Sequence, residues 1–212
     1  MGGDGIETKV VVGYVLAGGG STRFGRDKAL VEIGGTPMLL RMGALLGDIA
    51  KDVQVIAAPQ KYAALGIIGI GDRCEGQGPL AGIITALQTT EETGSGAEWN
   101  LIVGCDMPFL TREWLTYLAV RAQASGAEVV SPQSAQGLEP LCACWRTSAV
   151  RQLQNVFDGG VRKITEAMKR LRMEVVDAAD WKRFDTAGRL FWNMNTAADY
   201  DEAKRILEAQ RA

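Results

Sequence analysis

The residues whose types and spacing best suit chemistry lie between positions 15 and 28, in the stretch VLAGGGSTRFGRDK. A short apolar run ends there in three consecutive glycines, which are Gly18, Gly19 and Gly20. Glycine has no Cβ and tolerates positive φ, so its backbone N–H groups can approach an anion closely. Arg23 and Lys28 would add mobile positive charge. The stretch predicts a phosphate-binding loop; the alternative is a glycine-rich turn with surface charges.

Two familiar phosphate motifs do not match this stretch. A P-loop places Lys directly after the second glycine of GxxxxG and follows it with Ser or Thr, whereas Arg26 and Asp27 stand there. A dinucleotide fingerprint needs GxGxxG, and Arg23 occupies the position of its third glycine. The stretch therefore belongs to neither class.

Asp106, in the sequence GCDMP, is the second candidate for chemistry. It follows the apolar run 99–104, just as the glycines follow the run 10–16. Ligands of open parallel sheets bind beyond the carboxyl ends of the strands, so both segments should face the same crevice. Mg²⁺ is commonly held by one or two carboxylates together with substrate phosphates. Asp106 is predicted to bind magnesium; the alternative is a carboxylate that caps its own turn.

Two other features call for an explanation. Asn193 and Asn195 stand two apart in a predicted strand over 191–194, so their amides should point the same way. The alternative is a strand end at which Asn195 or Thr196 caps the final helix. Gly82 lies inside a helix predicted to begin at Pro79, where glycine costs about 1 kcal/mol relative to alanine. A glycine at this position indicates a close approach of another group.

The composition limits the possible chemistry. The chain has no histidine, which removes the commonest general base and every Ser–His or Cys–His mechanism, so catalysis must rest on carboxylates, cations or a metal. A net charge of −2 argues against a general nucleic-acid or membrane binder. We find neither a membrane-length apolar stretch nor a signal peptide and expect a cytoplasmic protein. The four cysteines form no CxxC pair and are expected to be buried free thiols.

Apolar runs alternate with helical segments up to about residue 126, which favours right-handed βαβ units and a parallel sheet. Strands are predicted at 10–16, 53–57, 67–70, 99–104, 128–131, 141–145, 173–176 and 191–194, with 141–145 a candidate antiparallel strand. Helices are predicted at 37–47, 60–65, 79–88, 111–125, 147–157, 162–171 and from 196 to 210. We expect one α/β domain over residues 1–212, a Rossmann-like three-layer α/β/α fold. Its sheet should be mostly parallel, with an antiparallel addition in the C-terminal third.

Residues 16–28 closely resemble the signature LAGGxSxRxGxDK of the sugar-nucleotide-type nucleotidyltransferases, with Phe24 where Met is usual. Within that superfamily, the AGG and DK of this stretch, GPLAG at 78–82 and NxNT at 193–196 resemble the molybdenum cofactor guanylyltransferases. The resemblance covers nearly the whole chain and is looser after residue 130. It implies transfer of GMP from GTP to molybdopterin or molybdenum cofactor, with release of pyrophosphate and with Mg²⁺ as the metal.

The resemblance also implies residue roles. The backbone of the glycines, together with Arg23 and Lys28, would hold and neutralise the departing phosphates, and Asp106 would bind the metal. Main-chain groups of Leu16 and Ala17 would contact the base, and Asp72 would lie at the nucleoside end of GTP. The pterin substrate would be held by Asn193, Asn195 and Arg162. The GTP-binding half would cover about 9–126 and the acceptor-binding part about 127–212.

Three other functions stay open at this stage. One is cytidylyl transfer to the same cofactor, and another is a sugar-phosphate nucleotidyltransferase. The third is a non-catalytic nucleotide-binding module, against which the presence of both Lys28 and Asp106 argues. For the guanylyl function the partners are GTP and molybdopterin, with cofactor-biosynthesis and acceptor enzymes as candidate protein partners.

Overall fold

The computed structural model describes residues 11–18 and 27–209, so the predicted site residues Gly19, Gly20 and Arg23 lie outside the described part of the chain. The strands of the described chain are β1 (Val11–Leu16), β2 (Glu32–Ile33), β3 (Thr36–Pro37), β4 (Asp52–Ile56), β5 (Trp99–Gly104), β6 (Val129–Ser134), β7 (Gly137–Leu138), β8 (Cys142–Arg146) and β9 (Met173–Val176). The α-helices are α1 (Met38–Gly47), α2 (Pro79–Glu92), α3 (Arg112–Gln123), α4 (Val150–Asp158), α5 (Ile164–Met168), α6 (Ala178–Trp181) and α7 (Ala197–Ala209). Short 3-10 turns are η1 (Lys28–Leu30), η2 (Ala63–Leu65), η3 (Thr147–Ala149) and η4 (Lys182–Phe184).

The main sheet has the order β4-β1-β5-β8-β6, with β7 and β9 both paired to β6. β1 pairs in parallel with β4 and β5, and β6 pairs in parallel with β9. β8 is antiparallel to both of its neighbours, β5 and β6. The prediction of a mostly parallel sheet with an antiparallel addition near residues 141–145 is therefore confirmed.

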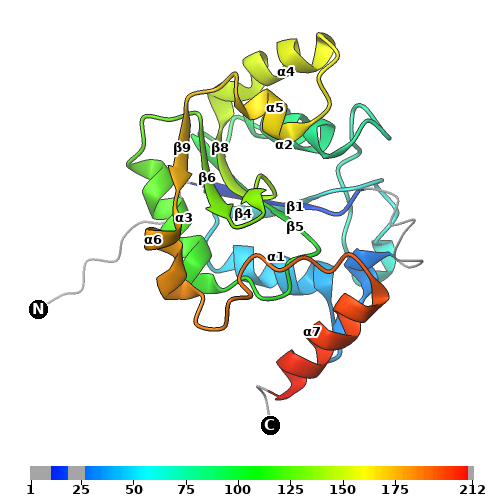
Figure 1. The fold of residues 1–212 in the computed structure, drawn as a ribbon. Helices are drawn as coiled ribbons and strands as arrows, with labels where there is room; N and C mark the ends of the chain where they lie inside the picture. The colour runs from blue at the N-terminus through cyan, green and yellow to red at the C-terminus, as the bar shows by residue number, and fades with distance from the viewer. Residues whose placement is uncertain (1–10, 19–26, 210–212) are drawn as a thin grey trace, which may run out of the picture.

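Helices cover both faces of the sheet (Figure 1). One apolar core contains side chains of α1, α3, α6 and α7, and the other contains side chains of α2, α4 and α5. β1 contributes alternately to the two cores, with Val11 and Val15 on one side and Val12 and Tyr14 on the other. This alternation is the period-two geometry of a strand that is buried on both faces. The three-layer α/β/α prediction is confirmed.

Several elements differ from the prediction, and the helix predicted over 60–65 is only the 3-10 turn η2. Residues 191–194 form no strand; the segment begins in a turn and has no ladder pairing, because its backbone bonds to Asp106 beyond the end of β5 and not to a strand. Residues 67–70 contribute only an isolated parallel bridge between Ile70 and Ile56. The helix predicted over 162–171 is the shorter α5. Thr111 caps α3 as predicted, since its side chain accepts a hydrogen bond from the backbone N–H of Trp114.

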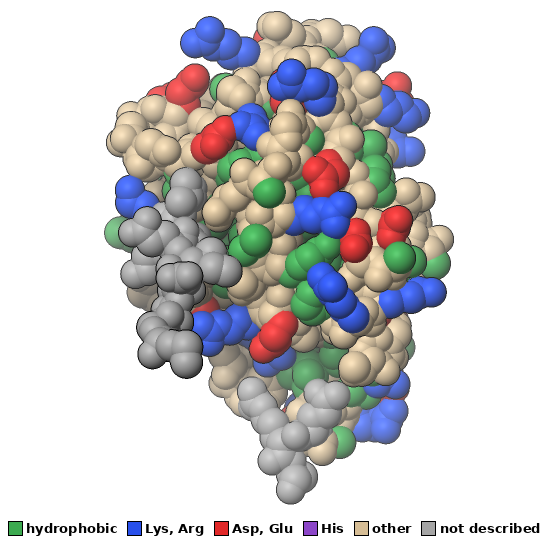
Figure 2. All heavy atoms as spheres, turned by 90° about the vertical axis from the view of Figure 1, so that its left-hand side faces the viewer, with side chains coloured by type: hydrophobic (Ala, Val, Ile, Leu, Met, Phe, Trp, Pro, Cys, Tyr) green, Lys and Arg blue, Asp and Glu red, His purple; other side chains and the backbone are tan. Residues whose placement is uncertain are grey.

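The surface agrees with the small net charge. On the face drawn in Figure 2, basic and acidic side chains of the described residues are mixed. Within residues 11–18 and 27–209, no helix combines the length and the apolar character needed to cross a bilayer. All four cysteines are free thiols, three of them buried and Cys74 half-buried. Burial raises the pKa of Cys142 to about 12, so this thiol stays protonated and unreactive at neutral pH.

Candidate functional site

The site begins where two neighbouring strands end side by side. In the parallel ladder of β1 and β5, Leu16 lies opposite Gly104, so the chain leaves both strands at the same edge of the sheet. Ala17 and Gly18 follow the first strand, and Cys105 and Asp106 follow the second. The expectation that the glycine stretch and Asp106 share one edge is confirmed for the described residues.

The carboxylate of Asp106 folds back over the end of its own strand. A Cβ built on Gly104 would lie 2.8 Å from Asp106 Oδ1, so glycine at position 104 leaves the space that this oxygen occupies. Asp106 Oδ1 is buried and has no hydrogen-bond partner among the described residues. A buried carboxylate oxygen without a partner is costly, so an oxygen in this position is suited to bind a cation.

Lys28 brings positive charge to this carboxylate. Its Nζ lies 3.5 Å from Asp106 Oδ2 and 3.1 Å from the Oδ1 of Asn195. The Lys28 and Asp106 side chains are 20% and 25% exposed, so both remain accessible to a ligand. Three predicted site residues that are far apart in sequence therefore meet at one point.

Asn195 reaches Lys28 because the segment before α7 is tied to Asp106. The backbone N–H of Met194 donates to the backbone oxygen of Asp106 at 2.8 Å. Thr196 then caps α7, since its Oγ1 accepts from the N–H of Asp199, whose carboxylate accepts from the N–H groups of Asn195 and Thr196. Burial alone would raise the pKa of Asp199, but these two backbone bonds lower it below its usual value. Of the two candidate caps, Asn195 and Thr196, the structure shows Thr196 in that role.

The residues of this site could hold a magnesium ion only together with substrate phosphates that supply further ligands. No group of three or more Cys, Asp or Glu side chains in the described ranges could enclose a metal. One carboxylate with a buried free oxygen nevertheless suffices where substrate phosphates supply the remaining ligands. Asp106 meets that condition, and no second carboxylate is needed.

Some of the main-chain groups predicted to contact the base already form hydrogen bonds within the protein. The N–H of Ala17 donates to the backbone oxygen of Ile56, and the carbonyl of Ala17 accepts from the hydroxyl of Tyr62. Gly18 is exposed at the same edge. Gly82 lies in the first turns of α2, where its missing Cβ would be 3.1 Å from Leu16 Cδ2. The close approach expected at Gly82 is thus the packing of α2 on the end of β1.

The hydrogen bonds of the Asp72 and Arg162 side chains are with other residues than Lys28, Asp106 and Asn195 in the described part of the chain. Asp72 Oδ1 accepts from the N–H of Cys74 and the hydroxyl of Thr85, which fixes the loop ahead of α2. The Nε of Arg162 donates to Gln77 in that same loop at 2.8 Å, and its guanidinium lies over the ring of Phe157. Arg162 therefore contacts the loop ahead of α2.

Asn193 does not share the position of Asn195. Its amide donates to the backbone oxygen of Phe191 at 3.2 Å, within its own segment. The expectation that the two amides point the same way rested on a strand over 191–194, and that strand is absent. Of this pair, only Asn195 forms a hydrogen bond with Lys28 among the described residues.

Several residues near the site were assigned no site role from the sequence. Lys61 and Tyr62 contact Asp27, the residue before Lys28. Glu139 is buried and accepts a hydrogen bond from Ser134 at 2.6 Å. Burial raises the pKa of Glu139, the Ser134 bond opposes that shift, and the charge of Asp106 adds to it. Only the tertiary structure places these residues near the site.

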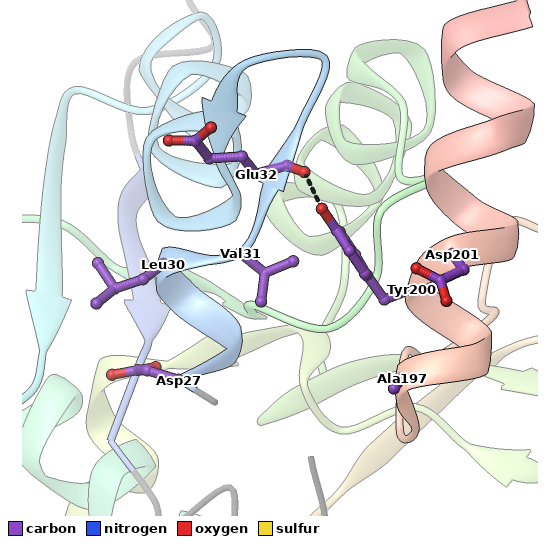
Figure 3. Close-up of a pocket in the computed structure, with 7 residues that line it drawn as sticks. All are labelled: Asp27, Leu30, Val31, Glu32, Ala197, Tyr200 and Asp201. Carbon is purple, nitrogen blue, oxygen red and sulfur yellow. Dashed lines mark hydrogen bonds between the residues drawn. The ribbon is translucent and has the colours of Figure 1, made fainter. Parts of the chain in front are cut away.

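A pocket of about 550 Å³ lies on the other side of η1, between that turn and α7 (Figure 3). In it the hydroxyl of Tyr200 donates to the backbone oxygen of Glu32 at 2.8 Å. The pocket is lined by Asp27, Leu30, Val31, Glu32, Ala197, Tyr200 and Asp201. Its lining, among the described residues, includes three acidic residues and no Lys or Arg, so the edge with Lys28 and Asp106 is the better phosphate site.

Comparison with known proteins identifies the family of this chain. A family model described as the MobA-like NTP transferase domain matches residues 13–173. The Mycobacterium tuberculosis (strain H37Rv) protein named "Probable molybdenum cofactor guanylyltransferase" is 35% identical over 196 residues, covering 91% of this chain and 92% of the relative. The Pelotomaculum thermopropionicum protein of the same name is 30% identical over 200 residues, covering 94% of each chain.

A solved structure extends the comparison to the fold. The crystal structure of molybdopterin-guanine dinucleotide biosynthesis protein A from Archaeoglobus fulgidus superimposes with a TM-score of 0.79. It is 25% identical and covers 93% of this chain and 99% of its own. The family model covers well over half of the chain. This chain therefore belongs to the family of MobA-like NTP transferase domains and is a nucleotidyltransferase.

Proposed function

We propose that this protein transfers GMP from GTP to molybdopterin or molybdenum cofactor, forming the guanine dinucleotide cofactor and releasing pyrophosphate. The observation that carries the proposal is the meeting of Lys28, Asp106 and Asn195 at the carboxyl ends of β1 and β5. The first two residues come from the proposed GTP-binding half, about 9–126, and the third from the acceptor-binding part, about 127–212. Lys28 thus stands between the two proposed substrates.

The reaction needs no general base. A terminal phosphate oxygen of the acceptor attacks the α-phosphorus of GTP, a new P–O bond forms, and the bond from the α-phosphorus to the bridging oxygen breaks. Pyrophosphate leaves with the electron pair. Because the nucleophile is already an anion, a chain without histidine can supply what is required, which is alignment and charge stabilisation.

In this proposal, Lys28 Nζ stabilises negative charge on the departing phosphates, and Arg23 and the glycines act with it. Asp106 would hold Mg²⁺, which when bound neutralises phosphate oxygens. The Asn195 amide would orient the acceptor beside Lys28, with Asn193 and Arg162 as further candidates for acceptor contacts. Leu16, Ala17 and Asp72 are proposed to lie at the nucleoside end. The free cysteines suit a reducing compartment, in line with a cytoplasmic location.

The test offers the purified protein each of the four ribonucleoside triphosphates with Mg²⁺ and molybdopterin. We expect pyrophosphate release with GTP above the other three, together with a guanine dinucleotide product identified by mass spectrometry. A preference for CTP would favour the cytidylyl function, and nucleotide binding without pyrophosphate release would favour a non-catalytic module. Either result would refute the guanylyl proposal.

A further inference from the structure

Tyr62 connects the two ends of the glycine-rich stretch. It lies after β4, is only 1% exposed, and belongs to the core beneath that edge of the sheet. Its hydroxyl is 2.8 Å from the backbone oxygen of Ala17 and 3.0 Å from Asp27 Oδ2. Ala17 precedes the stretch 18–26, and Asp27 follows it. One buried hydroxyl therefore contacts both ends.

Lys61 contacts the same two groups from the solvent side. Its Nζ is 2.9 Å from Asp27 Oδ2 and 3.5 Å from the backbone oxygen of Ala17. The other oxygen of Asp27, Oδ1, accepts from the N–H of Ala29 at 3.0 Å and so begins the turn η1. Lys28 is the first residue of that turn. The position of Lys28 therefore depends on how Asp27 is held.

We propose that Tyr62 and Lys61 are positioning residues that fix Ala17 and Asp27 relative to each other and thereby direct Lys28 toward the nucleotide phosphates. The inference rests on the proposed function only for the role of Lys28. Within the described residues, no hydrogen bond or ion pair joins either side chain to Lys28, so each acts through Asp27.

The chemistry of each residue suits this task. Burial and the charge of Asp27 raise the pKa of the Tyr62 hydroxyl, so it stays a hydrogen-bond donor at every pH at which the protein would work. The ammonium of Lys61 compensates the charge of Asp27, which would otherwise repel phosphates bound at the neighbouring Lys28. The Tyr62 hydroxyl, shared between the Ala17 carbonyl and the Asp27 carboxylate, fixes the orientation of that carboxylate. The Lys61 ammonium neutralises its charge.

The test compares Tyr62→Phe with Tyr14→Phe. Tyr14 is equally buried, and its hydroxyl is 2.8 Å from Thr90 Oγ1 in the opposite core, so its variant also loses one buried hydroxyl. We expect similar falls in Tm for the two variants. Only Tyr62→Phe should lower kcat/KM for GTP, by about tenfold, the size expected for loss of a hydrogen bond to a charged group. KM for molybdopterin should not change.

A second readout does not depend on activity. Hydrogen exchange followed by mass spectrometry should show faster exchange at the Ala29 amide in Tyr62→Phe than in the parent or in Tyr14→Phe. Unchanged exchange there, or a kcat/KM loss no larger than that of Tyr14→Phe, would overturn the inference. If the parent transfers no nucleotide, the proposed function fails while the exchange result still decides the positioning role.

Lys61→Met gives an independent variant if Tyr62→Phe does not fold. The Lys61 side chain is 34% exposed, so its replacement should leave the core intact. We expect a kcat/KM loss of about threefold to tenfold for GTP, with the Tm nearly unchanged. A turnover equal to that of the parent would contradict the role of Lys61.

Discussion

Replacing Asp106 with asparagine tests the centre of the site. The change keeps the size of the side chain and removes its negative charge. Asp106 pairs with Lys28 at 3.5 Å, a distance at which the gross attraction is about 5 kcal/mol at an effective dielectric constant of 20. Both side chains are partly exposed, so the net contribution of such a pair to folding is about 1 kcal/mol or less. The buried Oδ1 without a partner offsets part of that contribution.

We therefore expect Asp106→Asn to change the free energy of unfolding by no more than about 1 kcal/mol. Its effect on the reaction should be larger, because loss of one preorganised group that stabilises charge costs about 10² to 10³ in kcat, or about 3–4 kcal/mol. The expected rise in the activation free energy is therefore much larger than the expected change in the free energy of unfolding. A misfolded site would instead lower both quantities together.

The assay measures pyrophosphate release from GTP over a Mg²⁺ titration, with urea unfolding of the same preparations. We expect the variant to need more Mg²⁺ and to bind GTP without the Mg²⁺-dependent rise in Tm. Asp52→Asn is the control, because Asp52 is exposed at the amino end of β4, away from the site edge. Turnover of Asp106→Asn within threefold of the parent at equal Mg²⁺ would refute the metal-binding role.

Three further predictions follow from single contacts. Asn195→Ala should raise KM for molybdopterin about tenfold and leave the Kd for GTP unchanged by calorimetry; an equal loss in both would contradict an acceptor role. Gly104→Ala should force the Asp106 carboxylate aside, lowering kcat at least tenfold while Tm falls only slightly, and an unchanged kcat would show that this oxygen's position is unimportant. Because the pKa of Glu139 is raised, the native state binds that proton more tightly, so stability falls as pH rises above the unfolded value of about 4.3. Glu139→Gln should therefore gain Tm relative to the parent at pH 7 but not at pH 4, and an equal difference at both pH values would contradict the shift.

Local patterns in the sequence predicted much of this fold. The apolar run that ends in glycine placed β1 and its exit, and Pro79 after Gly78 placed the start of α2. Both signals are short-range, since they depend on backbone conformation and on burial of neighbouring residues. The position of Asp106 was predicted in the same way. The apolar run 99–104 predicts a buried strand, and Asp106 lies just beyond the carboxyl end of that strand.

Residues that act through tertiary contacts could not be predicted in this way. Nothing near Tyr62 in the sequence shows that its hydroxyl meets Asp27, 35 positions earlier. The apolar residues at 191 and 194 predicted a strand, but that segment packs on the end of β5 through one backbone bond to Asp106. A hydrophobic pattern indicates that a segment is buried, but it does not show which other segment packs against it.

The reversed strand β8 also determines how the protein must assemble. It lies between β5 and β6, and within residues 11–18 and 27–209 it alone connects β5, which ends two residues before Asp106, to β6 in the sheet. Until residues 142–146 have been synthesised and inserted, β5 has one unpaired edge, which can pair with another chain. A fragment ending near residue 126 would keep that edge open and would be prone to aggregate. β5 is therefore paired along both of its edges only after β8 has joined the sheet.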